Sequence, residues 1–73
     1  VPTINEEQQH ALDTLSPKEI EVAEQVSYGA TNKMIAKTMN ITERTVKSHL
    51  TSIFQKMGLP DRLTLAIFFR DLR

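Results

Sequence analysis

The sequence predicts an all-α domain of four helices that contains a helix-turn-helix, and three observations support this fold class. Helix-start signals recur along the chain, apolar residues follow a helical period, and no stretch alternates in the manner of a half-buried strand. A polar tether is expected at residues 1–14, with room for a short helix near residues 6–13, and residues 15–73 form the domain. The four expected helices span about residues 16–28, 32–39, 43–57 and 61–72.

The first expected helix begins with a strong start signal. Ser16 caps it, Pro17 occupies the first turn, where no amide donor is needed, and Glu19 reaches back to complete a capping box. Gly29 ends the helix, because glycine tolerates a left-handed conformation. The apolar positions that should face a core are Ile20, Val22, Ala23, Val26 and Tyr28.

Residues 31–57 have the pattern of two helices joined by a tight turn. Thr31 caps the shorter helix, Asn40-Ile41 forms the turn, and Thr42 caps the longer helix, which stops at Gly58. The apolar side of the shorter helix comprises Met34, Ile35, Thr38 and Met39. The longer helix carries a stripe that should face the core, formed by Val46, Leu50, Ile53 and Met57.

The other side chains of the longer helix sort onto two further faces at about 100° per residue. The face opposite the core stripe carries Arg44, Lys47, Ser48, Thr51 and Gln55. The flank between the two carries Thr45, His49, Ser52 and Lys56. Long donors reach guanine acceptors, and hydroxyls bond base or phosphate groups, so this helix is a candidate DNA reader. The alternatives are an ordinary solvated face and, for His49, a half-buried packing position.

The last expected helix, capped by Asp61, has too many apolar residues for one face. Leu63 and Ile67 point roughly away from a core-facing group formed by Leu65, Phe68, Phe69 and Leu72. A second apolar face usually meets another surface, and a second copy of the domain is the simplest partner. The alternative is that the amino-terminal segment covers Leu63 and Ile67, because its apolar residues Ile4 and Leu12 also require burial.

The formal net charge of zero hides a polarised chain. Residues 1–31 carry six acids and one lysine, a net charge of −5, whereas residues 32–62 carry six cations and two acids, a net charge of +4. A one-sided field lets a near-neutral protein bind a polyanion. Asn32 and Lys33, at the amino end of the shorter helix, add an anion-binding position through free amides and the helix dipole. The alternative is an internal balance, with the acidic helix docked on the basic ones.

Composition and motifs argue against several classes of protein. Without cysteine there is no disulfide framework and no thiolate metal site, and no apolar run approaches the roughly 18 residues of a membrane span. The chain shows no signal peptide, and it begins at Val1, as a fragment or a processed product would. No phosphate loop, histidine–cysteine cluster or nucleophile–base set is present, so neither an enzyme nor a cofactor is expected. A solvated helix face is the simplest interpretation of Glu19, Glu21 and Glu24.

Four spaced motifs carry a family resemblance: LSPKE, GATNKMIA, ITERTVKSH, and KMG followed by Arg62. The run from Leu15 to Arg62 resembles the DNA-binding domain of LuxR-type transcription regulators, most closely the response regulators of the NarL/FixJ group. The likeness extends to about Phe69. The resemblance implies a four-helix domain of bacterial, cytoplasmic regulators, whose third helix enters the major groove and whose fourth helix forms a homodimer.

The resemblance also implies roles and partners. Base contacts are implied at Lys47, Ser48 and Thr51, and the helix face adds Arg44. Backbone contacts are implied at Asn32, Lys33, Thr45 and His49, to which Lys56 adds charge, and the dimer contact falls on Leu63 and Ile67. The implied partners are double-stranded DNA, a second copy, RNA polymerase indirectly, and an amino-terminal receiver or sensor domain that this chain lacks.

Some residues depart from the family pattern. Ser48 occupies a position often filled by a small apolar residue, and Thr51 one often filled by a longer polar or basic residue, so a base preference cannot be transferred from a relative. Leu65 replaces a small alanine beside the bulky Phe68 and Phe69, which predicts a shifted packing angle for the last helix. Two rival functions remain open: a helical protein-interaction module that uses the second apolar face, and a helix-turn-helix like that of a sigma factor.

Overall fold

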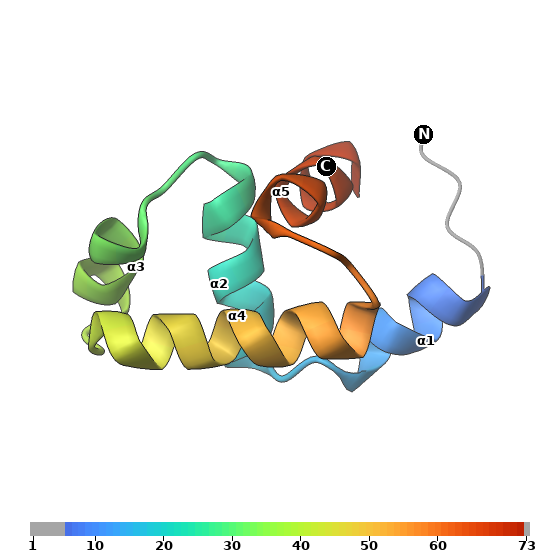
Figure 1. The fold of residues 1–73 in the computed structure, drawn as a ribbon, viewed down its shortest axis with the longest axis horizontal. Helices are drawn as coiled ribbons and strands as arrows, with labels where there is room; N and C mark the ends of the chain where they lie inside the picture. The colour runs from blue at the N-terminus through green and yellow to red at the C-terminus, as the bar shows by residue number, and fades with distance from the viewer. Residues whose placement is uncertain (1–5, 73) are drawn as a thin grey trace.

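The computed structural model describes residues 6–72, and the chain in this range is helical throughout, without a strand (Figure 1). Its helices are α1 (Glu6–Thr14), α2 (Pro17–Ser27), α3 (Asn32–Met39), α4 (Glu43–Met57) and α5 (Arg62–Leu72). The all-α class and the helix-turn-helix are confirmed, and the four expected helices agree with α2 to α5 within one residue at each end. The helix count is corrected to five in the described range, because the short helix expected in the tether is formed as α1.

The longest helix, α4, organises the domain. α1, α2 and α3 all pack against α4, and α2 also packs along α5. Figure 1 shows α3 beside the first turns of α4 and α1 beside its last turns, with α5 beside the upper part of α2. The helices between residues 6 and 72 are too short or too polar to cross a membrane.

The core lies where α2, α3, α4 and α5 converge. Its largest fully buried side chains are Val22, Ile35, Val46, Ile53 and Leu65. The predicted stripe of α4 is confirmed, because each of its four members is buried: Val46, Leu50, Ile53 and Met57. Complete burial of a large aliphatic side chain stabilises the fold by about 1.5–3 kcal/mol, so this stripe holds α4 firmly on the domain.

The predicted helix caps are formed by Ser16, Thr31, Thr42 and Asp61. The side chain of each cap accepts a hydrogen bond from the backbone amide three residues later, at 2.8–3.2 Å. The carboxylate of Glu19 also accepts from the amide of Ser16 at 2.8 Å, which completes the capping box. Because capping hydrogen bonds favour the ionised carboxylate, the pKa of Asp61 is lowered.

Two glycines end helices as predicted. Gly29 has a φ of 87° after α2, and Gly58 has a φ of 65° after α4, both in the left-handed region. This conformation lets the amide of Ala30 return to the carbonyl of Gln25 at 3.1 Å.

Three assignments to an apolar side are wrong, those of Tyr28, Met34 and Thr38. Tyr28 is 71% exposed and Met34 is 56% exposed, whereas Ala36 is buried. The buried face of α3 consists of Ile35 and Ala36, with Met39 packed at its edge, so Thr38 points to solvent. An eight-residue helix offers only one narrow stripe to α4, and small Ala36 allows closer packing there than Met34 would.

The two faces of α5 are separated as predicted. Leu65 and Phe69 are buried, whereas Leu63 is 69% exposed and Ile67 is 40% exposed. The partly buried side chains at the core edge include Phe68 and Leu72.

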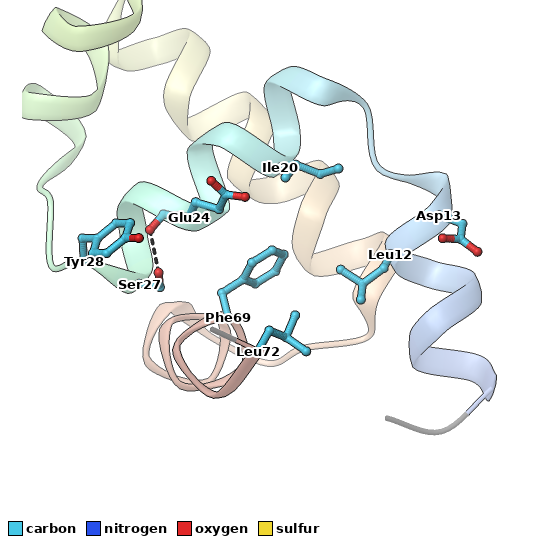
Figure 2. Close-up of a pocket in the computed structure, with 8 residues that line it drawn as sticks. All are labelled: Leu12, Asp13, Ile20, Glu24, Ser27, Tyr28, Phe69 and Leu72. Atoms are coloured by element: carbon cyan, nitrogen blue, oxygen red, sulfur yellow. Dashed lines mark hydrogen bonds between the residues drawn. The ribbon is translucent and has the colours of Figure 1, made fainter. Parts of the chain in front are cut away.

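Leu12 of α1 lies near the core-facing side of α5, not over its second apolar face. It lines a pocket of about 410 Å³ between α1, α2 and α5, together with Phe69 and Leu72 (Figure 2). The alternative in which the amino-terminal segment covers Leu63 and Ile67 is therefore wrong for the described part of that segment. Ile4, the other residue of that alternative, lies outside the described residues.

Candidate nucleic-acid interface

The turn between α3 and α4 depends on one left-handed residue. Asn40 ends α3 with φ 57° and ψ 46°, a conformation that asparagine tolerates better than most residues. The amide of Ile41 then donates to the carbonyl of Ala36 at 2.9 Å, and Thr42 caps α4. The local sequence therefore sets the angle at which α4 leaves α3.

One face of α4 is open to solvent. Its exposed side chains are those predicted from the helical period: Arg44, Lys47, Ser48, Thr51 and Gln55. The opposite face is the buried stripe, in which Val46 and Ile53 have no exposed surface. The polar face is thus presented on a rigid support, and small side chains at Ser48 and Thr51 let another surface approach the helix backbone.

The hydroxyl of Thr51 has a defined hydrogen-bonding role. It donates to the backbone carbonyl of Lys47 at 3.0 Å, one turn earlier on α4. The hydroxyl proton is used in this bond, so the oxygen faces outward as an acceptor. The ammonium of Lys47 only donates, so this surface offers a donor and an acceptor one helical turn apart.

The amino-terminal half of the α4 flank is half-buried. Thr45 is half-buried, and its hydroxyl lies 2.9 Å from the hydroxyl of Thr42. His49, one turn further along, is also half-buried, as its packing alternative predicted. Both side chains keep a solvent-facing edge beside the exposed face.

The carboxy-terminal half of the flank is linked to the end of α1 and the start of α2. Lys56 Nζ lies 2.8 Å from Oε1 of Glu19 and 3.3 Å from the carbonyl oxygen of Thr14, and Ser52 also hydrogen-bonds Glu19. Burial of the carboxylate raises its pKa, but the hydrogen bonds from Lys56, Ser16 and Ser52 outweigh burial. Together with the charge of Lys56, they lower the pKa of Glu19 to about 2.

This network changes two interpretations from the sequence. Glu19 is 4% exposed, so its assignment to a solvated helix face is wrong, although Glu21 and Glu24 are exposed. The side chain of Lys56 is 39% exposed, but its ammonium is engaged by Glu19 and Thr14, an interaction that the predicted phosphate contact did not include.

The charge segregation seen in the sequence persists in the fold. Between residues 6 and 72 the ion pairs are Lys56–Glu19 and Arg70–Asp71. Internal balance is therefore limited to one contact between α2 and α4. Within the described range, the exposed cations of α3 and α4 that form no such pair are Lys33, Lys37, Arg44 and Lys47, and Glu43 is the exposed acid of these helices.

A second long-range contact meets the start of α3. Arg62 donates from Nη1 to Oδ1 of Asn32 at 2.5 Å and from Nη2 to the carbonyl oxygen of Ala30 at 2.6 Å. Lys33, the next residue, is exposed. The Arg62 contact was not predicted, because its partners lie about thirty residues away and no local pattern connects them. The arginine after KMG was visible in the sequence only as part of a motif.

Within the described residues, no group of three or more His, Cys, Asp or Glu side chains could hold a metal ion. The candidate interface is made of donors and acceptors on the surfaces of α3 and α4. The residues predicted to contact the DNA backbone come from two helices. Asn32 and Lys33 lie at the start of α3, and Thr45 and His49 lie in the first half of α4.

Comparisons with known proteins agree with this arrangement. Residues 13–69 match the family model described as bacterial regulatory proteins, luxR family. The chain is 44% identical over 66 residues to transcriptional regulatory protein LnrK of Bacillus subtilis, covering 89% of this chain and 30% of LnrK. It is 36% identical over 62 residues to the nitrate/nitrite response regulator protein NarL of Escherichia coli K12, covering 85% of this chain and 29% of NarL.

The response regulator NarP of Escherichia coli K12 is 32% identical over 62 residues, which cover 85% of this chain and 29% of NarP. The chain therefore spans less than a third of the length of these relatives. No solved structure matches it significantly. The chain belongs to the luxR family of bacterial regulatory proteins, as a helix-turn-helix DNA-binding domain.

Proposed function

We propose that this domain binds specific sequences of double-stranded DNA with α4 in the major groove. The observation that carries the proposal is the exposed face of α4, on which Lys47, Ser48 and Thr51 lie opposite the buried stripe. An α-helix fits the width of the major groove, where each base pair presents a distinct pattern of donors and acceptors. A rigid helix with a donor, an acceptor and small side chains suits that pattern.

Each residue of this face has a proposed role in base recognition. Lys47 donates to the acceptors on a guanine edge, and the outward oxygen of Thr51 accepts from an amino group of cytosine or adenine. Ser48 lets the helix approach the groove floor. Arg44, in the first turn of α4, reaches a neighbouring base.

Residues around this face hold the DNA backbone. Asn32 and Lys33 lie at the amino end of α3, where the helix dipole favours a phosphate, and Thr45 and His49 flank the base-reading face. For Lys56 we propose a structural role in place of a phosphate contact, because its ammonium is bound to Glu19 and Thr14.

We also propose that the domain binds DNA as a homodimer through α5. The exposed side chains of Leu63 and Ile67 form an apolar patch on that helix, and two apolar residues support only a weak dimer without DNA. Two copies would insert their α4 helices into successive major grooves, about 34 Å apart.

The greater length of the relatives supports a larger regulator. NarL is a response regulator protein, and it extends well beyond the region that this chain matches. We infer that the domain acts in the bacterial cytoplasm and is controlled by an amino-terminal receiver or sensor domain of a longer protein. It would affect RNA polymerase indirectly, through the DNA site that it occupies.

The test is selection of duplexes from a random pool by the purified domain, followed by titration of the enriched sequence. The proposal predicts an enriched motif with two half-sites about one helical turn apart. A matched pool should be selected with a variant that carries Lys47→Ala and Thr51→Ala. Equal binding of all duplexes, or no binding at low salt, would contradict the proposal and favour a protein-interaction module that uses α5.

A further inference from the structure

We propose that Arg62 is a positioning residue for the phosphate contact of Asn32, an inference that rests on the proposed function. Arg62 is the first residue of α5, and Asn32 is the first residue of α3. The two guanidinium nitrogens of Arg62 hold Oδ1 of Asn32 at 2.5 Å and the carbonyl oxygen of Ala30 at 2.6 Å. The side chain of Arg62 thus links α5 both to the loop before α3 and to the first side chain of α3.

The polarity of this contact determines how the Asn32 amide is presented. A guanidinium has only donors, so the amide must turn its oxygen toward Arg62. The Nδ2 group, with two N–H donors, then lies on the other side of the amide. Phosphate oxygens are acceptors, so Nδ2 is the end of Asn32 that can bind them. Arg62 therefore selects the orientation that makes Asn32 a phosphate ligand.

The contact is built to hold this orientation. Arg62 is half-buried, and its second hydrogen bond to Ala30 fixes the guanidinium on the loop. The planar fork of an arginine loses little freedom when both of its arms are bound. Asn32 is half-buried as well, so part of this residue stays open to solvent while its Oδ1 is held by Arg62. Without Arg62, the side chain could rotate and present its oxygen to the phosphate, where it would repel.

A purely structural role for Arg62, as a link between α5 and the α2–α3 loop, makes a different prediction. A double-mutant cycle separates the two roles. The variants are Asn32→Ala, Arg62→Gln and their combination, titrated against the selected duplex. The matched control is Arg70→Gln, which removes an exposed arginine from the same helix.

A positioning role predicts that each single substitution weakens duplex binding roughly tenfold, the size expected for one hydrogen bond to a charged group. The double variant should bind within about twofold of Asn32→Ala, because Arg62 acts through that residue. The slope of log affinity against log salt concentration should be the same for Arg62→Gln as for the wild type. A direct phosphate contact by Arg62 would instead make the slope of the variant smaller by about one. Losses that multiply to about a hundredfold would overturn the positioning role.

A second measurement needs neither DNA nor a stable variant. In the free wild-type domain, nitrogen-15 relaxation should show an ordered Asn32 side-chain amide, with the Asn40 amide as an internal reference. A freely mobile Asn32 amide would overturn the proposal. Absence of duplex binding by the wild-type domain would instead contradict the proposed function, so the two failures are distinguishable.

Discussion

Lys56 Nζ lies 2.8 Å from Oε1 of Glu19, and this contact ties the last turn of α4 to the first turn of α2. The same carboxylate accepts from the amide of Ser16, so one buried group both starts α2 and holds the far end of α4. The buried stripe fixes which face of α4 points outward, and the Glu19 contact helps to fix the position of the helix along the core.

The ionisation of Glu19 predicts a pH dependence of stability. Its pKa is about 2 in the fold against a usual value of 4.5. Because the folded-state pKa is the lower one, this stabilisation is complete above about pH 4.5 and is lost as the pH falls toward 2. The shift corresponds to on the order of 3 kcal/mol.

Urea unfolding between pH 7 and pH 2 measures this dependence. Glu19→Gln should flatten the fall in the free energy of unfolding below pH 4.5, whereas Glu21→Gln, at an exposed position of the same helix, should keep it. Parallel curves for the wild type and Glu19→Gln would show that the carboxylate is not held as described.

Lys56→Met should lower stability without changing the electrostatics of DNA binding. The substitution leaves the buried carboxylate of Glu19 without its cation, at a cost of about 2 kcal/mol. Lys33→Met, at an exposed lysine, should leave stability nearly unchanged but lower the slope of log affinity against log salt by about one. The reverse pattern, with the slope lowered by Lys56→Met, would return Lys56 to the set of phosphate contacts.

Leu63→Asp and Ile67→Asp should abolish cooperative binding of a duplex with two half-sites, while binding of a single half-site is retained. Both side chains are exposed, so an introduced carboxylate repels its copy across a dimer without entering the core. Ultracentrifugation of the free domain should show weaker self-association for both variants but not for Met34→Asp, an exposed apolar control on α3. Unfolding of either α5 variant would place that residue in the core instead.

The sequence predicted most of the local structure because local signals determine it. The caps at Ser16, Thr31 and Thr42 and the stop at Gly58 act within one helical turn. The helical period of the α4 sequence likewise allowed its buried stripe to be distinguished from its polar face. These elements include the helix-turn-helix and its exposed surface.

The contacts that the sequence did not reveal are those between distant residues. Glu19 and Lys56 are 37 positions apart, and Asn32 and Arg62 are 30 positions apart. A glutamate that closes a capping box has the same pattern whether it is buried or exposed, so only the packing of α2 on α4 identifies its second role. The prediction that Met34 faces the core was wrong for a related reason, because the sequence of a short helix does not determine which of its apolar side chains faces the helix packed against it.

Lys47→Ala, titrated against the selected duplex and a random duplex of equal length, tests the central claim most directly. If Lys47 contacts a base, the variant loses about 1–3 kcal/mol on the selected duplex and little on the random one. Lys37→Ala, which removes a charge from an exposed position of α3, should affect both duplexes alike. An equal loss on both duplexes for Lys47→Ala would contradict base reading by α4.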